Sequence, residues 1–190
     1  MTVLLIGMVV FIGIHSLAMV APGVRERAIA RLGTGAFRAV YGAIALIGVV
    51  LIAYGFALAR REPVVVYVPP PAMRHVVMLL MLPVFPLLLA GYLPGRIKSA
   101  TKHPVLVAVK LWAFAHLLAN GTGADLVLFG GLLAWAVADR ISWKRRPPPA
   151  SRTAPARPWN DAVAVIAGLA LYAIVVGWAH RAFIGVAPMG

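Results

Sequence analysis

The chain has 190 residues, of which 62% are hydrophobic and 12% are charged, and its mean hydropathy is +0.92. This composition is far from that of soluble domains and indicates an integral membrane protein, with membrane lipid as its surroundings. The net charge of +13 would indicate nucleic-acid binding only if the basic residues shared a water-exposed domain, but they lie between apolar segments. The absence of cysteine excludes disulfides, thiolate metal sites and cysteine nucleophiles.

Apolar segments long enough to cross a hydrocarbon core about 30 Å thick follow one another along the whole chain. They cover, approximately, residues 2–22, 36–59, 72–93, 104–120, 124–141 and 162–184. A cleaved signal peptide is the alternative for the first segment, but no basic residue precedes it and no clear cleavage site follows. The sequence therefore predicts an all-α, polytopic integral membrane helical bundle of about six transmembrane helices, forming a single domain over residues 1–190.

Several small or special residues predict local features of these spans. Gly42, Gly48 and Gly55 lie in the second span, where they would permit close approach of a neighbouring helix. The third span should kink at its prolines, Pro83 and Pro86. Asp125, the last residue of the TGAD turn, should cap the N-terminus of the fifth span with its carboxylate.

The distribution of Lys and Arg predicts the orientation, because basic loops are retained in the cytoplasm. The loops after the first, third and fifth spans hold most of these residues, including a Pro/Arg-rich linker over residues 143–160. The opposite side has only Arg60, Arg61, Arg74 and Arg181. We therefore expect both termini outside the cytoplasm, on the periplasmic side of a bacterial inner membrane.

Residues 103–131, HPVLVAVKLWAFAHLLANGTGADLVLFGG, embed ionisable and amide side chains in apolar sequence. An ionisable group at mid-membrane costs about 2.5 to 3.5 kcal/mol, so such residues need a compensating role. Trp112, His116 and Asn120 are spaced four apart and share one helix face. Another histidine, His15, lies inside the first span.

Two imidazoles from different spans in apolar surroundings suit the axial positions of haem b. His116 would lie about 18 Å, and His15 about 10 Å, from the cytoplasmic edge, a difference that helix tilt and a large ligand could bridge. Arg38 and His103 lie near that edge, where haem propionates would emerge. The alternative for His15 and His116 is hydrogen-bonded packing, and for His103 it is a local helix cap or an interfacial position.

The other candidate residues have simpler interpretations. Lys110 lies about 9 Å from the cytoplasmic edge, so it either snorkels to that edge or pairs with Asp139 at a similar depth. His75 and His180 are expected to be interfacial, and Trp135 to be an anchor or a packing residue. No P-loop, nucleophile elbow, H-E-x-x-H motif or carboxylate pair is present, so no soluble enzyme class is indicated.

Residues 103–131, followed by WAVADRISWKRR, closely resemble the signature of the NnrU family of membrane proteins. The stretches FIGIHS around His15 and FRAVYG from Phe37 are similar to other recurring motifs of that family. The resemblance covers about residues 1–146. It implies an association with nitrite and nitric oxide reduction in denitrifying bacteria, as a redox or accessory factor whose partners are denitrification-complex proteins.

The same domain resembles plant 15-cis-zeta-carotene isomerase, a haem b membrane enzyme that isomerises a polyene double bond. This second resemblance implies that the matching histidines, His15 and His116, are axial haem ligands. It makes a haem-dependent isomerase of a lipid-soluble polyene an alternative function, although it does not transfer the carotenoid substrate. Because the chain has no cysteine, a ligand exchange with a cysteine thiolate is excluded. A structural membrane partner without a cofactor is a third alternative.

Overall fold

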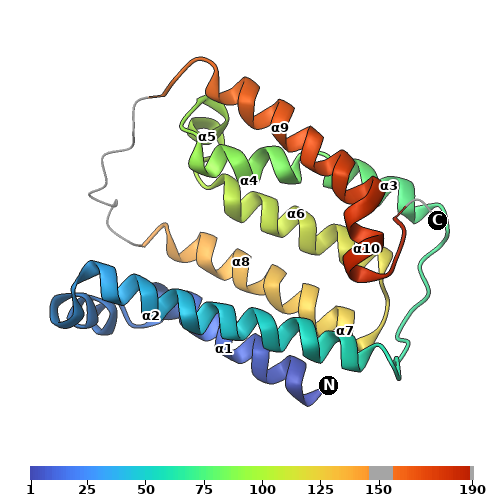
Figure 1. Ribbon diagram of the computed structural model, residues 1–190, viewed down its shortest axis with the longest axis horizontal. Coiled ribbons are helices and arrows are strands. Elements are labelled where there is room, and N and C mark those ends of the chain that lie inside the picture. Colours follow the sequence, from blue (N-terminus) through green and yellow to red (C-terminus); the bar gives the residue numbers. More distant parts are fainter. Residues whose placement is uncertain (146–155, 189–190) are drawn as a thin grey trace. The chain divides into compact units, whose positions relative to one another are not determined.

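The computed structural model describes residues 1–145 and 156–188, which excludes most of the predicted linker over residues 143–160. Within these residues the regular secondary structure is helical, apart from an isolated antiparallel bridge between Val65 and Thr122. The predicted all-α fold is therefore confirmed (Figure 1). The chain forms two compact units: the first unit consists of Met1–Tyr67 and Gly121–Trp143, and the second unit of Val68–Asn120 and Lys144–Gly190.

A helical stretch corresponds to each predicted span. Four stretches are long and apolar enough to cross a membrane, namely Thr2–Val20, Pro22–Ala59, Met73–Tyr92 and Asn160–Ile184. Helix α6 (Pro104–Ala119) is shorter, at 16 residues or about 24 Å, and covers most of a hydrocarbon core. The predicted fifth span is an unbroken helical run of α7 (Gly123–Asp125), the π-turn η1 (Leu126–Gly130) and α8 (Gly131–Ser142).

Glycines hold the first two helices of the first unit in backbone contact. Helices α1 (Thr2–Val20) and α2 (Pro22–Ala59) run antiparallel, since Leu4 meets Gly55 and Phe11 meets Gly48. A Cβ atom added at Gly48 would lie 2.9 Å from the Cβ of Phe11, and one added at Gly55 would collide with the backbone of Leu4. The predicted packing role of these two glycines is confirmed.

The same role is wrong for Gly42, because no atom of the residues that the structure describes lies within 4 Å of a Cβ added there. The helical period explains the difference. Gly48 and Gly55 are seven residues apart, which is almost two full turns, so they share a face. Gly42 precedes Gly48 by six residues and therefore lies about 240° around the helix from it.

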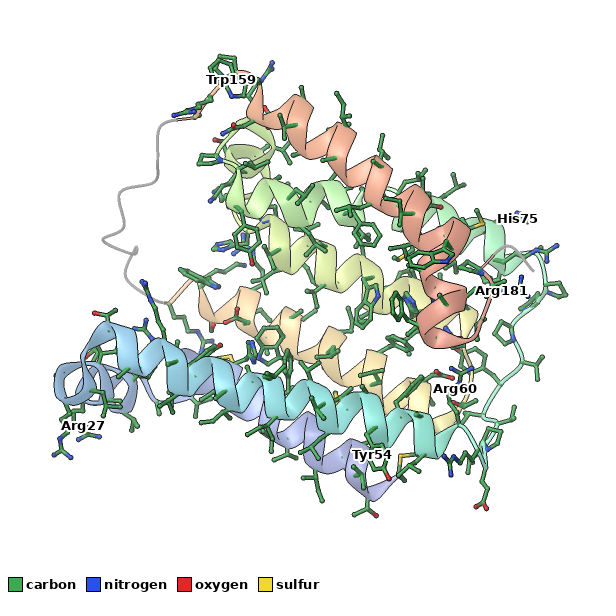
Figure 2. All side chains as sticks on the ribbon, viewed as in Figure 1. Arg27, Tyr54, Arg60, His75, Trp159 and Arg181 are labelled. Carbon is green, nitrogen blue, oxygen red and sulfur yellow. The ribbon has the colours of Figure 1, made fainter. Side chains whose placement is uncertain are left out.

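Helix α2 has 38 residues, or about 57 Å, which is far longer than a membrane is thick. It bends at Gly33, whose φ of 77° and ψ of 161° are not helical and lie in a region that side-chain-bearing residues rarely adopt. The basic loop predicted between the first and second spans is thus largely helical. Figure 2 shows Arg27 near the N-terminal end of α2 and Arg60 just beyond its C-terminal end.

A capping box begins the third helical stretch of the first unit. The hydroxyl of Thr122 accepts a hydrogen bond from the Asp125 backbone N–H at 3.3 Å, and the Asp125 carboxylate accepts one from the Thr122 N–H at 2.9 Å. These bonds satisfy donors that a helix N-terminus leaves unpaired. The predicted cap is confirmed.

The second unit is built around α3 (Met73–Met81) and α4 (Val84–Tyr92), which the predicted proline break separates. Pro83 lacks an N–H and cannot continue the hydrogen-bond ladder. The core between α4 and α6 contains Val84, Leu87 and Ala108. The short α5 (Arg96–Thr101) links these two helices.

The last helical stretch packs against α4 in the opposite direction. It consists of α9 (Asn160–Ile174), the π-turn η2 (Val175–Ala179) and α10 (His180–Ile184). A Cβ atom added at Gly168 would collide with the backbone of Pro86, so the two helices are in close contact there. At the start of α9, the side-chain amide of Asn160 donates to the Pro94 carbonyl at 2.7 Å.

Candidate functional site

His15, the first predicted haem ligand, lies half-buried on α1 in the first unit. Its Nδ1 lies 2.7 Å from the carbonyl oxygen of Phe11, one turn earlier on the same helix. A carbonyl can only accept, so Nδ1 carries the proton in this hydrogen bond. In the neutral ring the lone pair is therefore on Nε2, the nitrogen farther from the backbone.

Aromatic rings from three helices surround the imidazole of His15. Its ring centroid lies 4.1 Å from that of Phe11, 5.4 Å from that of Tyr41 on α2 and 5.7 Å from that of Trp135 on α8. The indole Nε1 of Trp135 is buried and has no hydrogen-bond partner among the described residues. A buried donor without a partner is costly and marks a position where an acceptor is expected.

His116, the second predicted ligand, lies half-buried on α6 in the second unit. Its Nδ1 lies 2.8 Å from the carbonyl oxygen of Trp112, so this imidazole has the same tautomer as His15. The Trp112 and His116 ring centroids are 5.1 Å apart, and the amide of Asn120 donates to the His116 carbonyl at 2.9 Å. Trp112 and His116 thus share a helix face as predicted, whereas Asn120 lies just beyond the end of α6 and has an extended backbone.

The structure brings a second histidine, His180, next to His116. The two ring centroids are 6.5 Å apart and the ring planes are inclined by 28°. His180 is the first residue of α10 and directly follows the π-turn η2. Insertion of a residue in a π-turn changes the face that the next residues present, and such turns are frequent at functional sites. The sequence predicted only an interfacial position for His180.

A cavity of about 350 Å³ lies within the second unit and includes both of these imidazoles. Its walls come from the segment before α3, from α3 and α4, from the end of α6, and from the last helical stretch with the residues after it. Most of the lining side chains are Pro, Met, Val, Ala and Phe. The polar lining residues are Arg74, His116, Asn120, Tyr172 and His180.

Three of these polar lining residues, Arg74, Tyr172 and His180, were not predicted as site residues. The Tyr172 hydroxyl donates to the Met78 carbonyl at 3.1 Å and so joins α9 to α3. Tyr172, Val176 and His180 are spaced four apart in the sequence and all face the cavity, although the π-turn η2 lies between Tyr172 and His180. Nothing in the sequence indicates that this face meets the end of α6.

The remaining predicted site residues are divided between the units. Arg38 is exposed on α2 of the first unit. Asp139 lies on α8 of the same unit, and its carboxylate is 3.3 Å from the Ser142 hydroxyl. Lys110 is half-buried on α6 of the second unit. His103 occupies the N-cap position of α6, but its side chain makes no capping hydrogen bond there.

The donor chemistry limits which metal groups the described residues can hold. No cluster of three or more His, Asp or Glu side chains suitable for a metal ion is present in residues 1–145 and 156–188. A protein site for a bare Zn²⁺ ion uses at least three such ligands. Haem iron needs only one or two ligands from the protein, because the porphyrin supplies the others. Imidazoles with a fixed tautomer, such as those of His15 and His116, fit that requirement.

The family model described as "NnrU protein" matches residues 3–188, which is nearly the whole chain. The chain belongs to the NnrU family. The match extends beyond the motifs that first indicated this family and includes both units and the cavity of the second unit. No curated protein and no solved structure matches the chain.

Proposed function

We propose that this NnrU-family membrane protein binds haem b, for which His15 in the first unit and His116 in the second unit are the candidate ligands, and acts as a redox or accessory factor in denitrification. The observation that carries the proposal is that the two imidazoles make the same kind of hydrogen bond, each to its own helix. Each donates from Nδ1 to the carbonyl four residues earlier, at 2.7 Å in His15 and 2.8 Å in His116. Metal-ligating histidines are characteristically oriented by such a bond, which leaves the Nε2 lone pair for the metal.

The surroundings of His15 support a bound group of this kind. Phe11, Tyr41 and Trp135 form an aromatic wall around its imidazole. The partnerless indole N–H of Trp135 would donate to an acceptor on the bound group. Bound haem would supply a one-electron redox centre whose potential depends on its ligands and on the polarity around it. The link to denitrification, and to denitrification proteins as partners, is based on the family alone.

The visible spectrum of the purified full-length protein tests the haem. After expression with sufficient haem supply, we expect a Soret band and the reduced bands of a b-type haem. His15→Ala and His116→Ala should each shift or abolish these bands, because each removes a ligand. His75→Ala is the matched control, since His75 is exposed and should leave the spectrum unchanged.

Absence of a Soret band in the folded protein would overturn the haem proposal and favour a structural membrane partner without a cofactor. A spectrum that neither His15→Ala nor His116→Ala alters would show that other ligands hold the haem.

A second candidate is a haem-dependent cis–trans isomerase of a lipid-soluble polyene. The observation that favours it is the largely apolar cavity, which includes the imidazole of His116 in its lining. Incubating the haem-loaded protein with cis-polyenes under reducing conditions, followed by chromatography of the isomers, separates the two candidates. Isomerisation above that of the His116→Ala variant would favour the enzyme.

A further inference from the structure

The cavity of the second unit has the size of a small-molecule site. Its volume of about 350 Å³ is near the lower end of the usual range for such pockets, roughly 300 to 1,000 Å³. Val77, Met81 and Phe85 line the side formed by α3 and α4, and Val176 lines the opposite side. An apolar body of modest length would be desolvated on these walls. The volume suits a single chain better than a two-chain phospholipid.

The described residues that line the cavity include basic side chains but no acidic ones. Arg74 is the permanently charged residue among the described lining residues, and two imidazoles, His116 and His180, accompany it. No Asp or Glu is present among these residues. Arg74 lies in the first turn of α3, is exposed and lines a largely apolar cavity. A guanidinium group presents paired N–H donors that match the two oxygens of a carboxylate.

The end of the chain forms part of the chamber wall. Gly185 has a left-handed conformation, with φ of 78°, and ends α10. The Nδ1 of His180 donates to the Val186 carbonyl at 2.7 Å. Ala187 and Pro188 follow and also line the cavity. One imidazole thus both lines the chamber and holds the C-terminal segment that helps to enclose it.

We propose that this chamber binds a single-chain lipid carboxylate, with its hydrocarbon chain along α3, α4 and η2 and its carboxylate at Arg74. The cavity shares His116 with the proposed haem function, but the proposal depends on Arg74 and the apolar walls, and its test does not use the haem spectrum. A carboxylate would balance the basic lining, and the apolar walls would accept the chain. A neutral hydrocarbon would use the walls but not Arg74.

Equilibrium binding of radiolabelled laurate to the purified full-length protein in detergent tests this site. We expect saturable binding that unlabelled laurate displaces, with dodecanol at least tenfold weaker because it lacks the anionic head. Arg74→Gln should weaken laurate binding by about tenfold or more and leave dodecanol binding unchanged. Arg181→Gln is the matched control: it removes an exposed arginine next to His180 that does not line the cavity (Figure 2).

Several results would overturn the proposal. Laurate that does not bind saturably to the unaltered protein would remove the site. Equal binding of laurate and dodecanol, unaffected by Arg74→Gln, would indicate a ligand without a charged head, such as a polyene. Displacement of laurate by phosphatidylglycerol at equal concentration would indicate a phospholipid headgroup site. An Arg181→Gln effect as large as that of Arg74→Gln would indicate non-specific charge attraction.

Discussion

The backbone of Leu4 on α1 lies directly against Gly55 on α2, so closely that no side chain would fit between the two helices at this point. Without a hydrophobic driving force between helices in lipid, such backbone proximity is a main source of association. We expect Gly55→Val to separate α1 from α2 and to destabilise the protein by about 1 to 3 kcal/mol. Thermal unfolding of the detergent-solubilised protein measures this loss.

Gly42→Val is the control for that substitution, because a Cβ at Gly42 meets nothing within 4 Å. It adds the same side chain to the same helix, so its effect on the unfolding temperature should be small. Equal destabilisation by the two variants would contradict the assigned contact face of α2.

The capping box at the start of α7 should contribute measurably to stability. The Asp125 carboxylate accepts bonds from both the backbone N–H and the hydroxyl of Thr122, at 2.9 and 2.6 Å. Thr122→Val should cost about 1 kcal/mol, because it removes the hydroxyl that accepts from the Asp125 N–H. Thr34→Val, at an exposed position of α2, is the comparison in the same unfolding assay. Similar losses in both variants would argue against the cap.

Asp161 ties the start of α9 to the start of α5. Its carboxylate accepts from the backbone N–H groups of Arg96 at 2.8 Å and Ile97 at 3.1 Å. Asp161→Ala should destabilise the protein by about 1 to 3 kcal/mol, because both donors lose a charged acceptor. Removing the exposed carboxylate of Glu62 should have little effect on the unfolding temperature. If Asp161→Ala unfolds at the same temperature as the unaltered protein, this connection is unimportant.

The His180→Phe substitution tests the hydrogen bond of His180 apart from its ring contact with His116. The substitution keeps an aromatic ring beside His116 but removes the donor to Val186. We expect faster amide hydrogen exchange in a peptide that covers residues 180–188, by a few-fold, since a hydrogen bond contributes about 0.5 to 1.5 kcal/mol. His75→Phe, at an exposed position, should leave exchange in that peptide unchanged. Unaltered exchange in His180→Phe would mean that other contacts hold the C-terminal segment.

Local sequence properties predicted much of the fold. The length of each apolar segment is enough to indicate a helical span, and the observed helices lie within a few residues of the predicted spans, except that α2 begins at Pro22 and not near residue 36. The proline break near Pro83 and the cap at Asp125 depend on residues adjacent in the chain. The contact between the rings of Trp112 and His116 follows from their spacing of four residues on one helix.

The sequence alone determined the composition and the helical spans, because they depend on neighbours in the chain. It also placed a backbone carbonyl four residues before His15 and before His116, within reach of each imidazole, because one helical turn has 3.6 residues. The tertiary structure decided that Gly48 and Gly55 contact α1 whereas Gly42 does not, that Trp135 lies beside His15, and that His180 meets His116 across 64 residues of chain. Those choices depend on the rotation of each helix about its axis and on the π-turn before His180. Both are set by packing against other helices, and a single segment carries no information about its neighbours' faces.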